Sequence, residues 1–508
     1  MADLITRFRC RLSRTQVDVQ RWLAWACILV LTCWSVALSV AQIRQNHLPV
    51  ISQCWDGADL AYFQTDSEQA RFFMGEDEGN YLLNAWQLTR GEVAHDFNGS
   101  MIWAAASAPY NPDMKKVTPL YDVLFALGKG THLPPPYFVS YRSVVFASLG
   151  VPIVRAMGCS SDSLLVLRYM VLPFKALLIL SVCGLVISML TRYRYWAALL
   201  TAGLLSFDTQ LTVASSTFMA DVPGTALFFL ALLMSMSLHL SQKGMGPRTM
   251  ALAILTGGLF ALAVLIKFDF LYLAPVAFIL PAVLSPKPQR RNAWKFSGII
   301  FLIYALCLGV YAHRNYTLTD QWFLTSKDTV NLYIGNNADA PSRQFRYGFS
   351  AADAERLKEI PIRNIKVLES SGPELAMRQY FSQLLIQTVS ENPGRTIEMV
   401  AQKAALFLTS GQYVQYPLLG RLSVILSTLV MVLGLLSFVI TLVARPSRNR
   451  QLLVLPVAYT MLLGMLSLVF FEPRFLTHLY PFAILSIVAC LQWIQSQVEN
   501  GRSTTQRT

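Results

Sequence analysis

Three neighbouring acids, Glu76, Asp77 and Glu78, stand directly before the apolar and aromatic segment "GNYLLNAW" at 79–86. A carboxylate can act as a general base or as a ligand of a divalent cation, provided that a rigid element holds it at the reacting atom. A solvated loop edge is the plainer explanation of such a run. The three acids therefore indicate chemistry only if other parts of the chain supply partners for them.

Other charged residues collect at the ends of long apolar segments, on one side of the predicted topology. The members of this layer are Asp77, Glu78, Lys115, Lys116, Asp208, Asp221, Lys267, Asp269, Arg314, Glu472 and Arg474. Lys and Arg bind phosphate, and carboxylates act as bases or metal ligands. The layer suits a reaction on a lipid whose phosphate lies at the membrane interface. For any single member, an ordinary interface charge is an equal alternative.

The composition indicates that membrane helices position these residues. The chain has 508 residues, of which 54% are hydrophobic and 14% charged, whereas soluble domains carry roughly 25% charged residues. A membrane-spanning helix needs about 20 mostly apolar residues. The ten segments predicted to span are 22–43, 169–190, 196–216, 222–241, 250–266, 268–285, 296–312, 419–443, 451–471 and 478–496.

The distribution of charge orients these helices. If the N-terminus is cytoplasmic, every short segment on that side is basic, and the only acids there are Asp3, Asp18 and Glu499. Basic cytoplasmic loops are the usual topology signal. A single helix over 250–285 would place "SPKPQRRNAWK" outside, so two helices are predicted there. The net charge of +13 is explained by basic loops facing anionic lipid, and no nucleic-acid partner is expected.

Two outer segments, 44–168 and 313–418, are too long to be simple connectors and are expected to carry function or to fold on their own. The predicted units are an N-terminal transmembrane core at 1–312 that includes the first outer loop, a mostly helical outer domain at 313–418, and C-terminal helices with a short cytoplasmic tail at 419–508. No repeat with a period of 20–50 residues is visible.

The cysteines give one structural expectation. Of the eight, only Cys54 and Cys159 fall in an outer segment, and both flank the acidic run. A disulfide between them would form in an oxidising compartment, with two free thiols as the alternative. No C-x-x-C pair or His/Cys cluster indicates a zinc site.

Six segments, in chain order, resemble motifs of the integral-membrane glycosyltransferases with the GT-C fold. The resemblance is to the protein O-mannosyltransferase and aminoarabinose-transferase-like group (glycosyltransferase family 39-like). The segments are "EDEGNYLLNAWQLTRGE" (76–92), "KKVTPLYDVLFALGKG" (115–130), "SSTFMADVPGTALFFLALLM" (215–234), "GLFALAVLIKFDFLYLAP" (258–275), "HRNYTLTDQWFLTSKDTVNLYIGNN" (313–337) and "EPRFLTHLYPF" (472–482). The chain departs from the family pattern at Thr118, Ile266 and Phe475, where Pro, Thr and Tyr are usual.

The resemblance implies an all-α polytopic membrane protein with about ten transmembrane helices, nine to thirteen being compatible with it. Asp77 matches the first-loop acid taken as the catalytic base, although an N-cap for a helix at 78–89 is the structural alternative. Glu78 fits the first turn of that helix and is a second candidate. Asp221 matches the second acidic motif, with a helix cap before Pro223 as its alternative. Glu76 matches no position of the family's acidic motif and is expected to be solvated.

The resemblance also assigns the donor phosphate to basic residues. Lys116 matches the family's phosphate-binding lysine and Lys115 is the runner-up, while Lys267 and Arg314 are second contacts and Arg474 a weaker one. No cofactor is implied with certainty. The identity of a metal stays open. If a divalent metal is used, Asp77 and Asp221 would hold it.

These features predict a hexosyl or pentosyl glycosyltransferase that moves a sugar from a polyprenyl-phosphate donor to a lipid, glycan or protein acceptor on the outer face. Compact outer loops favour a bacterial inner-membrane enzyme whose site faces the periplasm. The alternative is a transporter or flippase of lipid-linked sugars, which would place charged groups near the bilayer midplane. Lys175 is the one such residue, about one turn inside the second predicted span, and its side chain is expected to reach the outer face.

Overall fold

The structure is a computed structural model. It describes residues 2–45, 76–91, 143–240, 244–325, 327–336, 382–383, 385–409, 419–444, 450–469 and 473–505. Within these ranges the chain forms helices, turns and short connections, and no strand. Eight described helices are long and apolar enough to cross a membrane. The expectation of an all-α polytopic integral membrane protein is therefore confirmed.

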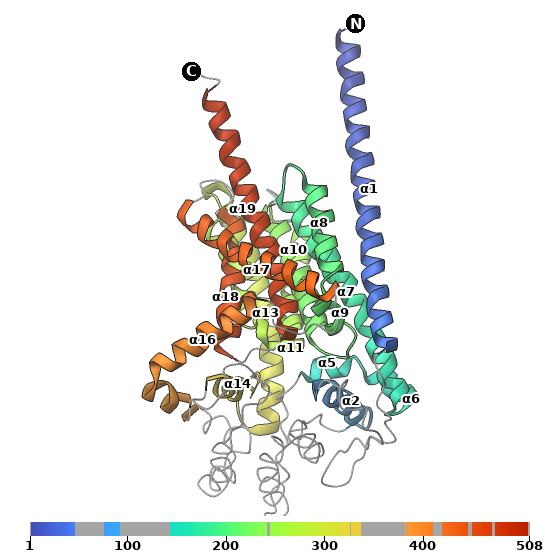
Figure 1. The fold of residues 1–508 in the computed structure, drawn as a ribbon, viewed down its shortest axis with the longest axis vertical. Helices are drawn as coiled ribbons and strands as arrows, with labels where there is room; N and C mark the ends of the chain where they lie inside the picture. Colours follow the sequence, from blue (N-terminus) through green and yellow to red (C-terminus); the bar gives the residue numbers. More distant parts are fainter. Residues whose placement is uncertain are drawn as a thin grey trace, which may run out of the picture.

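The long helices form the body of the molecule (Figure 1). They are α1 (Ala2–Gln45, apolar from Val19), α7 (Ser161–Met189), α10 (Asp221–Leu240), α11 (Pro247–Ile266), α13 (Lys287–Thr319), α17 (Leu419–Ala444), α18 (Val454–Leu468, after the 3₁₀ turn η4, Arg450–Leu453) and α19 (Leu476–Thr505). The shorter elements are α2 (Glu76–Thr89), α5 (Val144–Ser148), α6 (Val151–Met157), α8 (Arg194–Ser206), α9 (Thr209–Ala214), η3 (Phe268–Phe270), α12 (Leu273–Val283), α14 (Lys327–Asn336), α16 (Pro393–Leu408) and η5 (Pro473–Phe475).

Two of the ten predicted spans differ from expectation. The prediction of one helix over 196–216 is wrong, because the chain breaks at Asp208 into α8 and α9. Oδ1 of Asp208 accepts a hydrogen bond from the backbone N–H of Leu211 at 2.6 Å and so caps the N-terminus of α9. The segment 268–285 begins with η3 and leaves α12 only eleven residues long.

The prediction of two helices over 250–285 is confirmed. Helix α11 ends at Ile266, the chain turns through Lys267 and η3, and α12 follows. Both chain termini lie at one end of the molecule, whereas α2, α5, α6 and α14 lie at the opposite end (Figure 1). This second end is the one where the two long predicted outer segments join the helices.

Close helix contacts in the core depend on glycine. Helix α10 is one of the two most buried of the described spans, and it packs on α7, α11, α12 and α19. A Cβ atom at Gly257 of α11 would lie 2.7 Å from the carbonyl oxygen of Ile300 of α13. At Gly434 of α17 it would lie 2.9 Å from Cα of Ala483 of α19. Small residues at such crossings let membrane helices approach closely and gain dispersion energy.

Lys175 fastens α1 to the core. Its side chain is fully buried, and Nζ donates to Ser35 O and Ser39 Oγ, each at 2.8 Å, and to Thr212 Oγ1 at 3.2 Å. The expectation that Lys175 reaches the outer face is therefore wrong. Helix α7 begins at Ser161, so Lys175 lies about four turns inside it, where acceptors on α1 and α9 satisfy the ammonium.

Candidate active site

A cluster of four ionisable side chains lies where α10 begins and α11 ends. Nζ of Lys267 is 2.9 Å from Oδ1 of Asp221 and 3.2 Å from Oδ2 of Asp269. Nε2 of His478 is 3.3 Å from the same Asp221 oxygen and 3.8 Å from the same Asp269 oxygen. Two nitrogens thus face two carboxylates in a closed ring. The four residues come from α10, the end of α11, η3 and α19.

A hydrogen-bond relay fixes the orientation of His478. The hydroxyl of Thr225 donates to the backbone oxygen of Asp221 at 2.7 Å, one turn back along α10. Nδ1 of His478 lies 2.5 Å from the same hydroxyl oxygen. Because a hydroxyl has a single proton, Nδ1 of the imidazole must be the donor in this pair. Nε2 is thereby directed at the carboxylates of Asp221 and Asp269.

Two cations lie near one aromatic ring in this cluster. Nζ of Lys267 is 5.0 Å from the centre of the Phe475 ring, and Cζ of Arg474 is 5.7 Å from it. Arg474 also lies 3.9 Å from the sulfur of Met219, just before α10. Two like charges beside one ring favour the arrival of an anion, because the attraction of an anion offsets their repulsion.

Local backbone features bring these side chains together. Lys267 ends α11 in an extended conformation, and the 3₁₀ turn that follows carries Asp269. Gly224 allows α10 to approach, since a Cβ atom there would lie 2.6 Å from Cβ of Lys267. Burial alone would lower the pKa of Lys267, but the carboxylates of Asp221 and Asp269 raise it above its ordinary value. The amine is therefore an ammonium ion across the physiological range.

Glu78 lies elsewhere, in a buried ion pair. Its Oε1 is 2.8 Å from Nε of Arg168, and its Oε2 is 2.9 Å from Nη2. Oε1 also accepts the backbone N–H of Phe218 at 2.7 Å. Neither charged side chain has exposed surface. This geometry joins α2 to α7 and to the segment before α10, so it positions the acidic run of α2 relative to Asp221.

Asp77 lies in the first turn of α2, because the helix begins at Glu76. The structural alternative, in which Asp77 is the N-cap of a helix at 78–89, is therefore wrong, and the catalytic assignment of Asp77 stays a prediction. Its side chain, like that of Glu76, is outside the described residues. Lys115, Lys116 and Glu472 are also outside them.

Arg314 lies near the C-terminal end of α13, beside the cluster rather than in it. Its guanidinium is 5.7 Å from the Tyr311 ring centre and donates to Oδ1 of Asn315 at 2.9 Å. The Tyr311 ring in turn lies 6.1 Å from the ring of Phe268 in η3. Of the predicted site residues, the described part of the chain thus brings together Asp221, Lys267 and Arg474, with Arg314 a step further out.

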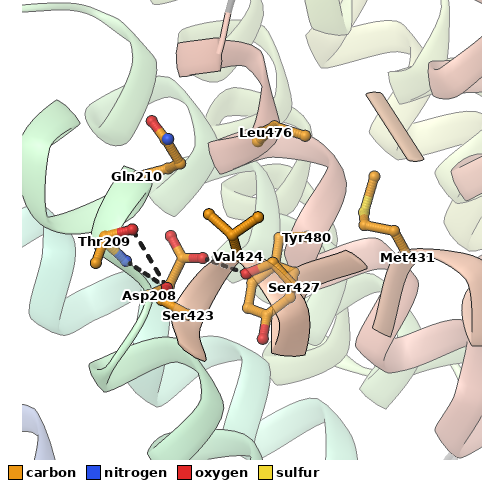
Figure 2. A pocket seen from close by; sticks show the side chains of 9 residues that line it. All are labelled: Asp208, Thr209, Gln210, Ser423, Val424, Ser427, Met431, Leu476 and Tyr480. Atoms are coloured by element: carbon orange, nitrogen blue, oxygen red, sulfur yellow. Dashed lines mark hydrogen bonds between the residues drawn. The ribbon is translucent and has the colours of Figure 1, made fainter. Parts of the chain in front are cut away.

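Asp208 makes a separate contact between α9 and α17, beside a small pocket (Figure 2). Its Oδ2 accepts from the hydroxyl of Ser427 at 3.1 Å, and the backbone N–H of Thr209 donates to Oγ of Ser423 at 3.3 Å. Burial raises the pKa of the Asp208 carboxyl, and the hydrogen bonds from Leu211 and Ser427 only partly offset this rise. Both oxygens of Asp208 have protein partners, so we assign it to helix packing.

No group of three His, Cys, Asp or Glu side chains able to hold a metal ion occurs among the described residues. The ammonium of Lys267 is the cation in contact with Asp221. The expected metal pair of Asp77 and Asp221 stays a prediction, since the Asp77 side chain is not described. Cys159 is disulfide-bonded, and its expected partner, Cys54, lies outside the described residues.

His478 and Thr225 are the members of the site that the sequence did not identify. A single His in an apolar helix is ordinarily a packed core residue, and a Thr one turn after an acid is common. The spacing of Asp221 and Thr225, four residues apart, is the available signal, because it puts both on one face of α10.

No protein-family model and no curated protein matches the sequence. Among solved structures, the chain is similar to the oligosaccharyltransferase of Archaeoglobus fulgidus. The apo form gives 14% identity and a TM-score of 0.48, covering 96% of this chain and 52% of that one. A form tethered with an acceptor peptide containing the NVT sequon gives 15% identity and a TM-score of 0.49, covering 95% of this chain and 51% of that one. A complex with an inhibitory peptide and a dolichol-phosphate gives 13% identity and a TM-score of 0.46, covering 96% of this chain and 52% of that one. At these identities and scores the likeness does not establish a family, and the chain spans about half the length of those structures.

Proposed function

We propose that the protein is a membrane glycosyltransferase of the GT-C type that moves a sugar from a polyprenyl-phosphate donor to a lipid, glycan or protein acceptor. The observation that carries the proposal is the cluster of Asp221, Lys267, Arg474 and His478 at the end of the membrane helices. With Asp269 it gathers two carboxylates beside Lys267, His478 and Arg474, and a lipid phosphate bound at the ends of these helices would meet the cations there. The six motifs in family order support the same reading.

In this proposal the acceptor hydroxyl attacks the anomeric carbon of the donor sugar in a single inverting displacement. The bond between the anomeric carbon and the oxygen of the polyprenyl phosphate breaks. The proton of the acceptor hydroxyl passes to a carboxylate, which we assign to Asp77. Asp221 orients Lys267, and Lys267 and Arg474 neutralise the departing phosphate. Stabilising charge that develops in the transition state is usually the largest catalytic term. Lys115, Lys116 and Arg314 are further phosphate contacts in the proposal.

We further propose that the site faces the periplasm of a bacterial inner membrane, and that 1–312, 313–418 and 419–508 act as transmembrane core, outer domain and C-terminal helices. Helices α2 and α14, which come from the two long loops, lie at the end of the molecule opposite both chain termini (Figure 1). Glu78 of α2 is hydrogen-bonded to Phe218, just before the start of α10 where the cluster lies. The basic segment at the N-terminus lies toward the other end (Figure 1).

One observation favours the alternative, a transporter or flippase of lipid-linked sugars. Lys175 is a charged residue deep inside a membrane span, as transport pathways require. Its hydrogen bonds to Ser35, Ser39 and Thr212 indicate that the Lys175 side chain is held in place, because all three acceptors are protein groups. Movement of a fluorescent lipid-linked sugar across proteoliposomes would support the alternative if it occurred without any sugar transfer.

The test of the proposed function is sugar release from a set of polyprenyl-phosphate sugars by the purified protein. Replacing Asp77 by Asn should lower turnover by about a hundredfold or more, because a general base contributes roughly 10²–10⁴. Asp320→Asn is the matched control, since Asp320 is an exposed acid at the end of α13. Near-normal turnover of the Asp77 variant would remove the catalytic assignment, and no release by the wild type from any donor would remove the function.

A further inference from the structure

The two carboxylates that contact Lys267 are held very differently. The Asp221 side chain is 3% exposed, and its Oδ1 is 2.9 Å from the ammonium and 3.3 Å from Nε2 of His478. The Asp269 side chain is 32% exposed, and its Oδ2 is 3.2 Å from the ammonium. Its next contact, Nε2 of His478 at 3.8 Å, is beyond hydrogen-bond range. Asp221 is therefore a fixed partner of Lys267, and Asp269 is a weakly held one.

Asp269 is the more exposed of the two carboxylates that contact the ammonium, although the Oδ2 atom that faces Lys267 is itself buried. It lies in η3, a single 3₁₀ turn between α11 and α12, whereas Asp221 lies at the buried start of α10. The Lys267 side chain is 14% exposed, so part of it faces outward. An anion that approaches this cluster from outside the helices meets Asp269 before it meets Asp221.

A phosphate oxygen can make the contact that the Asp269 oxygen makes. Both are anionic oxygens that accept charge-assisted hydrogen bonds from an ammonium at about 2.7–2.9 Å. A phosphate has further oxygens to offer to Arg474, which shares the Phe475 ring with Lys267. The carboxylate at 3.2 Å is longer than the favoured contact, so exchange for a phosphate gains both a shorter bond and a second cation.

We propose that the Asp269 carboxylate is a placeholder for the donor phosphate. It neutralises the outward side of Lys267 in the empty site, and the phosphate of a polyprenyl-phosphate lipid displaces it on binding. This inference rests on the proposed function, because it assigns a step within the same site. It makes Asp269 a specificity-determining residue that lowers the affinity for any phosphate and leaves the strongest binding to ligands that engage Lys267 and Arg474 together.

The test measures binding of farnesyl phosphate to the full-length protein in detergent, with farnesol and inorganic phosphate as probes of tail and headgroup alone. Asp269→Asn should bind farnesyl phosphate roughly fivefold more tightly, the upper range for a partly exposed ion pair. Asp320→Asn removes the same charge from an exposed site at the end of α13 and should leave the affinity unchanged. In a Lys267→Met background, Asp269→Asn should give no gain.

Each outcome decides something. Unchanged or weaker binding by Asp269→Asn overturns the placeholder while sugar transfer by the wild type keeps the proposed function. An equal gain in the Lys267→Met background or in Asp320→Asn also overturns it, since the effect would then be one of net charge. If Asp269→Asn binds farnesyl phosphate more tightly but no variant transfers sugar, the placeholder inference is supported and the proposed glycosyltransferase function is contradicted. Equal binding of farnesol and farnesyl phosphate by the wild type removes both.

Discussion

The buried charges of this protein differ in what is available to a substrate. Glu78 and Arg168 have no exposed surface, and both oxygens of Glu78 accept hydrogen bonds from protein groups. Asp221 and Lys267 lie at the edge of the helices, where Lys267 is partly exposed. The first pair therefore holds α2 against α7, whereas Lys267 keeps Asp221 as a fixed partner and has a second, more exposed partner in Asp269. This distinction separates two acids that the sequence places in equivalent motifs.

The Glu78–Arg168 pair leads to a prediction about stability. Replacing Glu78 by Gln, or Arg168 by Met, should destabilise the protein by roughly 3–5 kcal/mol, because either change leaves a buried charge without its partner. The expected readout is a clear loss of melting temperature for both single variants in detergent. The double variant should regain part of it, since no uncompensated charge remains. Unchanged melting of Glu78→Gln would contradict the stabilising role assigned to this ion pair.

For individual residues, the sequence predicted which acids and bases belong to the site but not which of them pair with one another. Asp221, Lys267 and Arg474 were predictable because each sits at the end of an apolar run, where charge is unusual. Arg168 and His478 were not, because they lie within apolar helices and their partners are far away in sequence: Glu78 for Arg168, and Asp221 and Thr225 for His478. Only the packing of α19 against α10 brings His478 to the site.

Among the elements, α16 is tied to the membrane helices by one buried amine. Nζ of Lys403 donates to Gly335 O at 2.7 Å, to Asn336 Oδ1 at 3.0 Å and to Val469 O at 2.6 Å. These acceptors lie in α14 and at the end of α18. Val469 stands four positions before η5, so this contact lies close in sequence to Arg474.

This contact predicts a pH dependence of stability. Burial lowers the pKa of Lys403 to about 7, from an ordinary value of 10.5. Between these pH values the unfolded chain binds more protons than the folded one, so the free energy of unfolding should rise with pH, by at most about 1.4 kcal/mol per unit. Melting temperatures measured from pH 7 to 9.5 should show the rise in the wild type and a flatter profile in Lys403→Met. If the melting temperatures of the wild type and of Lys403→Met change with pH in parallel, the predicted role of Lys403 is contradicted.

The helices themselves were largely predictable, and the exceptions have a physical cause. Eight of the ten predicted spans are long helices, because apolar length is a strong signal. The break between α8 and α9 was missed because the composition stays apolar through Phe207 and Leu211. Asp208 ends the helix by capping the next one, and a cap within an apolar run is weak evidence until the backbone is known.

For the whole molecule, the sidedness of the helices decides which surface meets the substrate. Helices α2 and α14 lie at the end opposite both chain termini (Figure 1), and the cluster lies at the start of α10, next to the segment that is hydrogen-bonded to α2. The basic segment before the apolar part of α13 lies at the other end of that helix. Positive charge retained in the cytoplasm would place the termini inside and the cluster outside.

Helix α13 offers a matched pair of fusion sites for testing this orientation. A periplasmic alkaline phosphatase reporter fused after Arg290, near the start of the helix, should be inactive in a bacterial host, because three basic neighbours, Lys287, Arg291 and Lys295, hold this end inside. The same reporter fused after Asp320, at the other end, should be active. The opposite pattern would place the cluster on the cytoplasmic side and exclude an acceptor in the periplasm. Activity at both sites would mean that α13 does not cross the membrane.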